Sequence, residues 1–389
     1  MRERRLKEGK MIYDLTVSNP TECGIGYPTN ELLAALSQPE SLRYRADPRG
    51  ILTAREAVAG YYAQKSITID PSDILLTAST SEAYSMLFSL LFEPGDAVLV
   101  PVPSYPLFEF LARLSNVALC SYHLHYIDQE WRIDLESVKE AITGRTKAMV
   151  IVSPHNPTGA FLKKAELVVL QEIAAAHGLA LIVDEVFSEY ACGASQQRVH
   201  SAAGSSDVLT FVLNGISKLA GLPQIKLGWI VVSGTPADRR EALERLEVIA
   251  DTFLSVNTPV QVGLPNLLRC GQAIRSQIQQ RIAETRAVLE NCVDGVSACS
   301  LLTSEGGWYA VLRLPRTRTD EEWALELLDN TAVYTFPGYF FEFEQDGHLV
   351  LSLLPETTLF AEAIRRMVEY MRSCENTLQI SKVHTWSKR

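Results

Sequence analysis

Short apolar runs alternate with amphipathic stretches between about residues 50 and 235. Six runs rich in Val, Ile and Leu occupy positions 74–77, 97–101, 148–152, 180–184, 208–213 and 228–232. Continuous apolar runs of this length are typical of strands that are buried on both faces, as in a parallel or mixed sheet. Because helical patterns lie between several of these runs, the chain predicts an α/β sheet with crossover connections.

Two helix starts are marked by the spacing of polar side chains. Thr53 and Glu56 are spaced as a capping box, and so are Ser79 and Glu82. In this motif the side chains satisfy the free backbone amides at the start of a helix. The second start precedes the apolar stretch 84–92, which predicts a buried helix.

The pattern changes after residue 235. Helices are predicted over about 236–291, 320–329 and 358–373, with strands at 308–314, 333–336 and 348–353. This mixture is typical of a smaller α+β region. No repeat or Gly/Ser-rich linker separates the two regions, so we expect them to pack together.

Composition excludes several classes of partner. The chain of 389 residues has 36 Lys and Arg against 46 Asp and Glu, a net charge of −10. Nucleic acid is therefore not an expected partner, because no basic surplus is available to neutralise phosphates. No apolar run reaches the ~18 residues that span a bilayer. The charged residues 1–5 are followed by no apolar stretch, so we expect neither a secretory signal nor a membrane partner.

Cysteine and histidine usage indicates reduced thiols and no metal site. Seven cysteines are scattered without a C-x-x-C pair, which is typical of a cytoplasmic protein. His123 and His125 have no acidic or sulfur ligands nearby at metal-binding spacing. An ordinary strand with two polar residues on one face is the expected interpretation.

Polar residues follow several of the predicted strands directly. In open α/β sheets, ligands bind at the carboxyl ends of the strands, so these positions are the candidate site. They are Ser79, Thr80 and Ser81 after 74–77, Tyr105 after 97–101, Asn156 after 148–152, Asp184 at the end of 180–184, and Ser217 and Lys218 after 208–213.

The order of these motifs resembles the class I/II aminotransferases, which are pyridoxal-phosphate-dependent enzymes of fold type I. The resemblance covers nearly the whole chain and rests on an ordered set rather than on one motif. The set is Tyr44, Gly50, Arg55-Glu56-Ala57, Pro94-Gly95-Asp96, Ser104-Tyr105-Pro106, His155-Asn156-Pro157-Thr158-Gly159, Asp184-Glu185, Ser217-Lys218, Gly228-Trp229 and Pro337-Gly338. It implies a large domain over 46–285 with a mixed seven-stranded sheet between helices, and a small α+β domain formed by 1–45 and 286–389.

The resemblance implies pyridoxal 5′-phosphate as cofactor and a role for each strand-end residue. Lys218 supplies the primary amine that binds the cofactor's aldehyde and later moves a proton. Asp184 keeps the pyridine nitrogen protonated, since a nearby negative charge favours the cation. Asn156 donates to the ring oxygen and Tyr105 stacks on the ring. The structural alternatives are a solvated lysine, a capping aspartate, a turn asparagine and a core tyrosine.

The cofactor's phosphate is expected at the start of the helix that follows 74–77. Backbone amides at a helix start and nearby hydroxyls bind phosphate, although plain helix capping is compatible with the same residues. The resemblance implies Ser79, Thr80, Ser81, Ser217 and Lys226 at this position, together with Tyr44 of the partner subunit. It therefore implies a homodimer with a shared active site.

Three positions near the expected cofactor depart from the family pattern. Phe187 replaces a tyrosine that donates to the ring oxygen, so one hydrogen bond is lost. Lys226 replaces an arginine, which keeps the charge but loses the two-pronged geometry. Gly215 occupies a position where a phosphate-contacting Ser or Thr is common.

A fourth departure concerns the substrate. The family places an arginine that holds the substrate α-carboxylate before a Leu-Ser-type strand, and this position falls on Val350. An apolar side chain cannot bind a carboxylate, so either another cation does so or the substrate has no carboxylate there. Arg313 is one conceivable substitute, although it is equally compatible with a surface position.

The expected activity is ping-pong transamination between an amino donor and a keto acceptor, with atypical carboxylate recognition. The same lysine and cofactor also serve fold-type I lyases, decarboxylases and racemases, and the fold does not choose among them. A third alternative is a catalytically weak pyridoxal-phosphate-binding protein. Retention of both Lys218 and Asp184 disfavours this third alternative.

Overall fold

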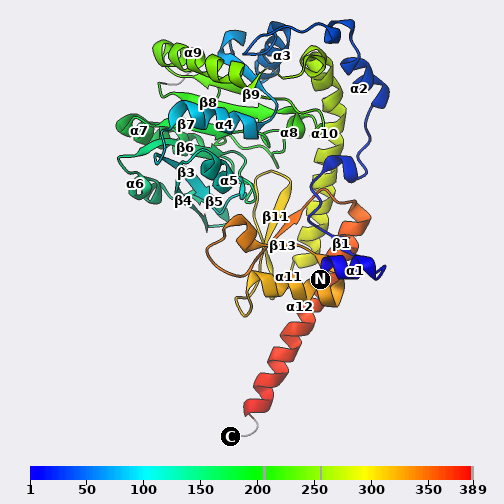
Figure 1. Ribbon diagram of the computed structural model, residues 1–389. Helices are drawn as coiled ribbons and strands as arrows, with labels where there is room; N and C mark the ends of the chain where they lie inside the picture. Colours follow the sequence, from blue (N-terminus) through cyan, green and yellow to red (C-terminus); the bar gives the residue numbers. More distant parts are fainter. Residues whose placement is uncertain (205–206, 255, 387–389) are drawn as a thin grey trace.

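The computed structural model describes residues 1–204, 207–254 and 256–386. Its largest element is a mixed sheet with helices on both faces (Figure 1). The spatial order of its strands is β2 (Ile74–Thr77), β9 (Gly228–Ser233), β8 (Thr210–Gly215), β7 (Ala180–Asp184), β6 (Thr146–Val152), β3 (Ala97–Val102), β4 (Ala118–Ile127) and β5 (Glu130–Ile133). β9 and β5 run antiparallel to their neighbours, and the remaining pairs are parallel. The predicted α/β sheet is confirmed.

The helices of this region divide between the two faces of the sheet. One apolar cluster includes side chains of α4 (Thr80–Leu91), α5 (Leu107–Leu114) and α9 (Pro236–Phe253). The other includes side chains of α3 (Leu52–Ala63), α6 (Leu135–Ala141), α7 (Lys164–His177), α8 (Ile216–Leu219) and α10 (Thr258–Val293). Strand residues alternate between the clusters: Leu181 and Val183 join the second, whereas Ile182 joins the first. Burial of each such side chain contributes roughly 1.5–3 kcal/mol, which explains the continuous apolar runs.

The large sheet has eight strands among the described residues, so the expected number of seven is wrong. The additional strand is β5, which pairs with the second half of β4 in a hairpin. Asp128 and Gln129 form its two-residue turn with φ angles of 52° and 64°. Hairpin turns with two positive φ angles usually carry Asn-Gly or Asp-Gly, so this turn has a weak sequence pattern. The strand interpretation of His123 and His125 is confirmed, because both lie in β4.

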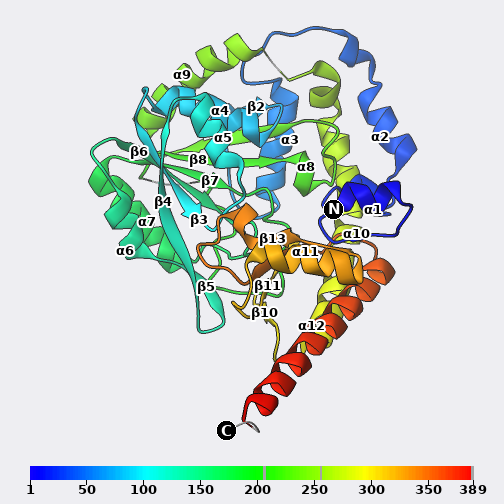
Figure 2. The same ribbon diagram turned by 60° about the horizontal axis from the view of Figure 1, so that its bottom comes forward.

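A smaller four-stranded sheet, counted within the described residues, lies beside the large one. Its order is β10 (Ser300–Leu302), β11 (Tyr309–Arg313), β14 (His348–Ser352) and β13 (Phe336–Pro337), and β1 (Tyr13–Asp14) pairs with β12 (Val333–Tyr334) nearby. Figure 2 shows α11 (Asp320–Thr331) and α12 (Thr357–Trp386) next to it. The α12 helix continues well beyond the predicted end near residue 373. The remaining helices are α1 (Arg2–Lys7), α2 (Thr29–Leu36) and the short 3-10 segments Pro20–Glu22, Pro39–Leu42, Pro71–Asp73 and Gly338–Phe341.

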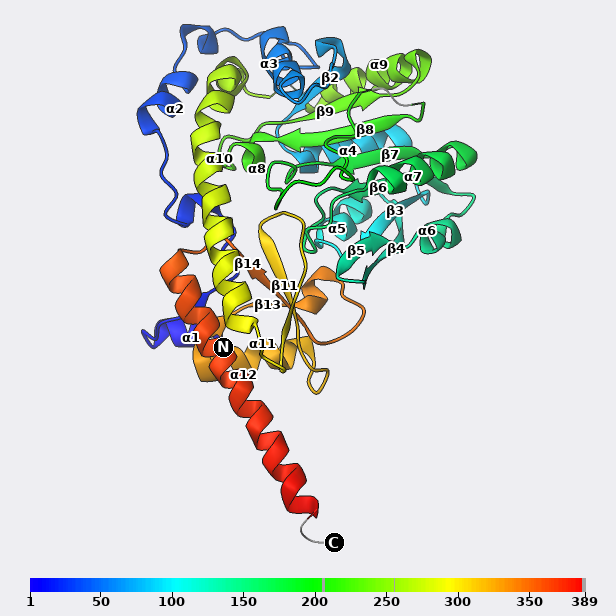
Figure 3. The same cartoon turned by 180° about the vertical axis from the view of Figure 1, so that it is seen from behind.

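The 36-residue helix α10 connects the surroundings of the two sheets (Figure 3). It packs against α8 and α3 at one end and against α12 and β10 further along. At Gly271 it approaches α8 so closely that an added Cβ would lie 2.3 Å from the Cβ of Ala220. The expected domain boundary at residue 285 falls within this continuous helix and stays a prediction.

The two predicted helix starts have different outcomes. The Ser79 hydroxyl accepts from the backbone amide of Glu82, as the capping box requires, whereas the Glu82 carboxylate accepts from the amide of Ala78 instead of that of Ser79. The prediction of a capping box at Thr53 is wrong, because α3 begins at Leu52 and has no side-chain cap. The backbone amide of Ile51 donates instead to the Gln261 side chain at 2.7 Å, so a residue of α10 replaces the local cap.

The loop after β6 is joined to the small sheet at Gly159. This residue has a φ of +71°, and its carbonyl accepts from the amide of Glu305. A Cβ at this position would lie 2.0 Å from the Ser304 Oγ and 2.3 Å from the Gly306 carbonyl oxygen. Only glycine fits both the conformation and the space.

We therefore expect Gly159→Ala to lower the free energy of unfolding by about 2 kcal/mol or more, through backbone strain and overpacking together. Urea unfolding followed by circular dichroism measures this change. Gly144→Ala is the matched control, because Gly144 is exposed, has an ordinary φ and has no atom within 4 Å of the added Cβ. Equal stability of the two variants would contradict the close packing at Gly159.

Candidate functional site

A cavity of about 320 Å³ lies at the carboxyl ends of the central strands. Its walls come from the start of α4, the ends of β7 and β8, and the loops after β3 and β6. Ten of the eleven residues implied by the resemblance border this cavity: Ser79, Thr80, Ser81, Tyr105, Asn156, Asp184, Phe187, Ser217, Lys218 and Lys226. Tyr44 does not border it, and its side chain is 75% exposed.

Lys218 lies in α8, directly after the buried strand β8. Burial of its amine, with the positive charge of Lys226, lowers the pKa of Lys218, and Asp184 partly opposes this effect. The Nζ atom lies 5.0 Å from the ring centre of Trp308 and 5.8 Å from that of Phe187. A lowered pKa increases the fraction of neutral amine, the form that attacks a carbonyl carbon.

Asp184 ends β7 and is buried. Its carboxylate accepts from the Tyr84 hydroxyl at 3.2 Å and from the backbone amide of Val186 at 3.1 Å. Burial nevertheless raises the pKa of Asp184 to about 6. The carboxylate is therefore incompletely compensated within the chain, and a cationic ligand group beside it would favour the charged form.

The start of α4 provides a site for an anionic group. The Ser79 hydroxyl is used by the helix cap, whereas first-turn amides such as those of Thr80 and Ser81 have no acceptor within a helix. Lys226 brings a positive charge to the same cavity from a backbone position with φ of +60°. Gly215 has a packing reason to lack a side chain, since a Cβ there would lie 2.9 Å from the carbonyl oxygen of Leu227.

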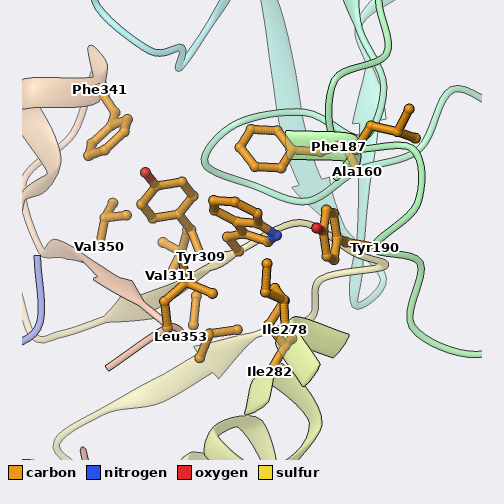
Figure 4. Packing of buried hydrophobic residues seen from close by; sticks show 14 of the residues in the cluster. Ala160, Phe187, Tyr190, Ile278, Ile282, Tyr309, Val311, Phe341, Val350 and Leu353 are labelled. Carbon is orange, nitrogen blue, oxygen red and sulfur yellow. The ribbon is translucent and has the colours of Figure 1, made fainter. Parts of the chain in front are cut away.

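Aromatic side chains form the remaining wall. Tyr105 is 48% exposed and borders the cavity, whereas Phe187 is buried against Trp308 with ring centres 5.3 Å apart. The Asn156 Oδ1 is buried without a hydrogen-bond partner among the described residues. Phe187, Tyr309 and Val350 lie in one packed group in Figure 4.

Neither Val350 nor Arg313 provides a charge inside the cavity. Val350 is fully buried and pairs with Val311 and Phe336 in the small sheet. Arg313 is exposed at the opposite end of β11 from Tyr309, which borders the cavity. Four residues of strand separate the two by about 13 Å. The prediction that Arg313 replaces the carboxylate-binding arginine in this cavity is therefore wrong.

These residues fit a phosphorylated pyridine aldehyde. Asp184 matches a protonated ring nitrogen, Asn156 has unused hydrogen-bonding capacity, and the α4 start with Lys226 matches a phosphate. Lys218 supplies an amine with a lowered pKa. The fit rests on the chemistry of these groups and on their common cavity.

Sequence reasoning missed several residues of the cavity. Tyr84 holds the Asp184 carboxylate, and Tyr309 contributes a hydroxyl to the lining. The stretch 84–92 also contains Ser85 and Ser89, so its pattern does not single out the Tyr84 hydroxyl. Tyr309 comes from a distant part of the chain, so no local pattern marks it.

Comparisons with known proteins agree with this geometry. The family model of aminotransferases of class I and II matches residues 19–366. The glutamate-pyruvate aminotransferase AlaA of Haemophilus influenzae is 28% identical over 375 residues, which cover 94% of this chain and 92% of that protein. The alanine aminotransferase of Mycobacterium tuberculosis is 29% identical over 380 residues, covering 94% and 87%. The solved alanine aminotransferase of Pyrococcus furiosus shares the fold with a TM-score of 0.86 at 24% identity, over 95% of each chain.

The raised pKa of Asp184 predicts a pH-dependent stability of the cofactor-free protein. Between about pH 4 and 6 the folded state holds a proton that the unfolded state, with the ordinary value of 3.8, has lost. The free energy of unfolding therefore falls as the pH rises through this window. Asp184→Asn lacks this titration, so its stability relative to wild type should increase by about 2 kcal/mol between pH 4.5 and 7.5.

Urea unfolding at several pH values in this range measures the difference. Asp251→Asn, at an exposed carboxylate of α9, is the control and should give a constant difference. A pH-independent difference for Asp184→Asn would show that burial does not raise the pKa of Asp184.

Proposed function

Because this chain belongs to the class I and II aminotransferases and is a pyridoxal-phosphate-dependent transferase of that family, we propose that it transfers the amino group of an amino acid or related amine to a keto acid. The reaction proceeds by ping-pong transamination. The observation that carries the proposal is the common cavity of Lys218 and Asp184 at the start of α4. When bound there, pyridoxal 5′-phosphate supplies the aldehyde that receives the amino group and the ring that accepts electrons.

Each of the chain's own groups has a defined task in this proposal. The Lys218 amine would hold the aldehyde group of the cofactor until the donor's amine takes its place, and it would then accept the proton of the donor's α carbon and pass it to the cofactor. The Asp184 carboxylate holds the proton on the ring nitrogen, and Tyr84 holds that carboxylate in place. Asn156 and Tyr105 orient the ring, while the first turn of α4, Ser217 and Lys226 bind the phosphate.

We propose that the substrate carboxylate is recognised without an arginine. Among the described residues that border the cavity, the cations are Lys218 and Lys226, and both have tasks toward the cofactor. Hydroxyl groups of Ser18, Tyr105 and Tyr309 are the remaining polar side chains near the aromatic wall. Hydroxyls bind a carboxylate more weakly than a paired guanidinium does, so amines without an α-carboxylate are candidate donors too.

The same observation keeps a second reaction type open. A fold-type I lyase or decarboxylase uses the same lysine and cofactor. The replacement of the carboxylate-binding arginine by Val350 favours this alternative over ordinary transamination. The names of the relatives favour transamination with glutamate as donor and pyruvate as acceptor, which forms alanine. This pair is therefore the first to test.

We propose that the active enzyme is a cytoplasmic homodimer. Tyr44 is exposed and lies outside the cavity of its own chain, as expected for a residue that contacts the cofactor of a second copy. Leu42, two residues earlier, is 91% exposed, so an apolar side chain is available next to it for subunit contact. The described helices contain no apolar span long enough to cross a membrane. All seven cysteines are free thiols, which is typical of a reducing compartment.

The proposal predicts that Lys218→Ala abolishes transamination. The protein is loaded with pyridoxal phosphate and mixed with a panel of amino acids and simple amines. Wild type should change its visible absorption and form one keto product per amino group transferred. Lys218→Ala should lose at least about a thousandfold in rate, because both the covalent bond and the proton transfer depend on its amine.

Lys147→Ala is the control, because Lys147 is exposed on β6 and away from the cavity. It should retain wild-type absorption and rate. Release of carbon dioxide or ammonia by wild type, without a keto product from transfer, would instead establish the lyase or decarboxylase alternative.

A second prediction concerns Phe187, which lacks the hydroxyl that the family uses at the cofactor's ring oxygen. Phe187→Tyr adds a donor to that oxygen, so the pKa of the linkage between Lys218 and the cofactor should fall by about one unit. A pH titration of the visible absorption measures this midpoint. Phe187→Leu changes the packing without adding a donor and should leave the midpoint near that of wild type. An unchanged midpoint in Phe187→Tyr would refute the role assigned to this position.

A further inference from the structure

A second groove, of about 310 Å³, lies between the β4–β5 hairpin and the small sheet. His123, His125 and Trp131 border it from the hairpin, and Arg313, Arg316 and His348 border it from the small-sheet side. Figures 2 and 3 show β4 and β5 next to the small sheet in two different views. The groove shares no lining residue with the cofactor cavity.

The groove gathers positive charge in a chain of net charge −10. The Arg313 side chain has neither an ion-pair nor a hydrogen-bond partner among the residues that the structure describes. Among the same residues, the Arg316 guanidinium hydrogen-bonds only to the neutral Gln345 side chain. The histidines of the other wall have carboxylate neighbours: Glu344, which borders the groove, is 3.2 Å from the Nδ1 of His123, and Asp134 is 3.3 Å from the Nε2 of His125.

The two arginines act on a common neighbour. His348 is the first residue of β14 and lies opposite Arg313 of β11, with its ring stacked on Phe343 at 4.4 Å. Its burial lowers its pKa, and the charges of Arg316 and Arg313 lower it further, whereas Asp320 opposes them. Arg313 pairs with His348 in the β11–β14 ladder, and both arginines border the same groove as His348. A bound anion there would be close to two guanidinium groups.

The opposite wall of the groove contains a buried polar group, the indole N–H of Trp131. Trp131 is 6% exposed, and this N–H has no hydrogen-bond acceptor among the described residues. Buried N–H groups without a partner are rare in proteins and cost about 1–3 kcal/mol. The hairpin wall of the groove therefore contains an unsatisfied donor.

We propose that this groove binds a small polyanion, a metabolite with two or more carboxylate or phosphate groups, between the Arg313–Arg316 side and the Trp131–His123–His125 side. Paired guanidinium groups suit such oxygens because each can donate two parallel hydrogen bonds. The site goes beyond the proposed transamination, because it uses none of the residues assigned to that reaction.

The groove is connected to the cofactor cavity through two chain segments. Val102 and Pro103 border the groove, and the next two residues, Ser104 and Tyr105, border the cavity. Strand β11 likewise has Arg313 at the groove and Tyr309 at the cavity. An anion held by both walls restricts the movement of these segments, so it is a candidate regulator of the reaction by coupling between two sites.

Calorimetric titration of the cofactor-loaded protein with citrate and with pyrophosphate tests the proposal. Loading first fills the phosphate site of the cavity, so an anion cannot bind there. Wild type should bind at least one of the two anions at one site per chain. Binding of citrate alone indicates a polycarboxylate, binding of pyrophosphate alone indicates a phosphate ligand, and binding of both indicates their shared chemistry.

Arg313→Gln and Arg316→Gln should each weaken binding about tenfold, and the double variant should weaken it about a hundredfold. Arg240→Gln, at an exposed arginine of α9, is the matched control and should bind as wild type does. Retained visible absorption of the cofactor shows that each variant is folded. Absence of binding to wild type, or equal binding by the double variant, overturns the proposal. Calorimetry measures binding directly, so the result does not depend on whether the protein transaminates.

Discussion

The structure depends on holding a carboxylate and an amine in one cavity at the edge of the large sheet. Burial raises the pKa of Asp184 and lowers the pKa of Lys218, so each group is charged less readily here than in water. Such a cavity forms only at the edge of a rigid support. The sheet provides it, because β7 and β8 are buried on both faces and end side by side at these residues. The apolar side chains on both faces of these strands bury the sheet, and the buried sheet in turn positions the reactive groups.

Elements with a strong local pattern could be predicted from the sequence, and elements fixed by distant contacts could not. The continuous apolar runs gave the central strands, since burial on both faces leaves a clear pattern. The hairpin strand β5 was missed because it is four residues long and follows an Asp128-Gln129 turn rather than a glycine turn. The start of α3 was misplaced because Gln261, more than two hundred residues later, replaces the local cap.

The candidate site shows the same division. The eight residues that follow strands could be assigned to one edge of the sheet, and all eight border one cavity. Tyr84 and Tyr309 could not be assigned, because their roles depend on where a helix and a distant strand pack. Arg313 does not reach the cavity, although it lies on the same strand as Tyr309. The two residues are at opposite ends of the five-residue strand β11 and therefore face different sites. Tyr44 is exposed and lies outside the cavity of its own chain, so its role toward the cofactor stays a prediction.

The continuous helix α10 acts mechanically as a lever. Its contact at Gly271 holds it against Ala220, two residues after Lys218, and leaves no space for the two segments to slide. From this point to Val293 the helix extends about 33 Å. A tilt of about 5° at the contact therefore moves the far end, beside the small sheet, by about 3 Å. A small displacement around the reactive amine would therefore be enlarged at the far end of the helix, and a movement of the small sheet would reach the amine reduced in the same proportion.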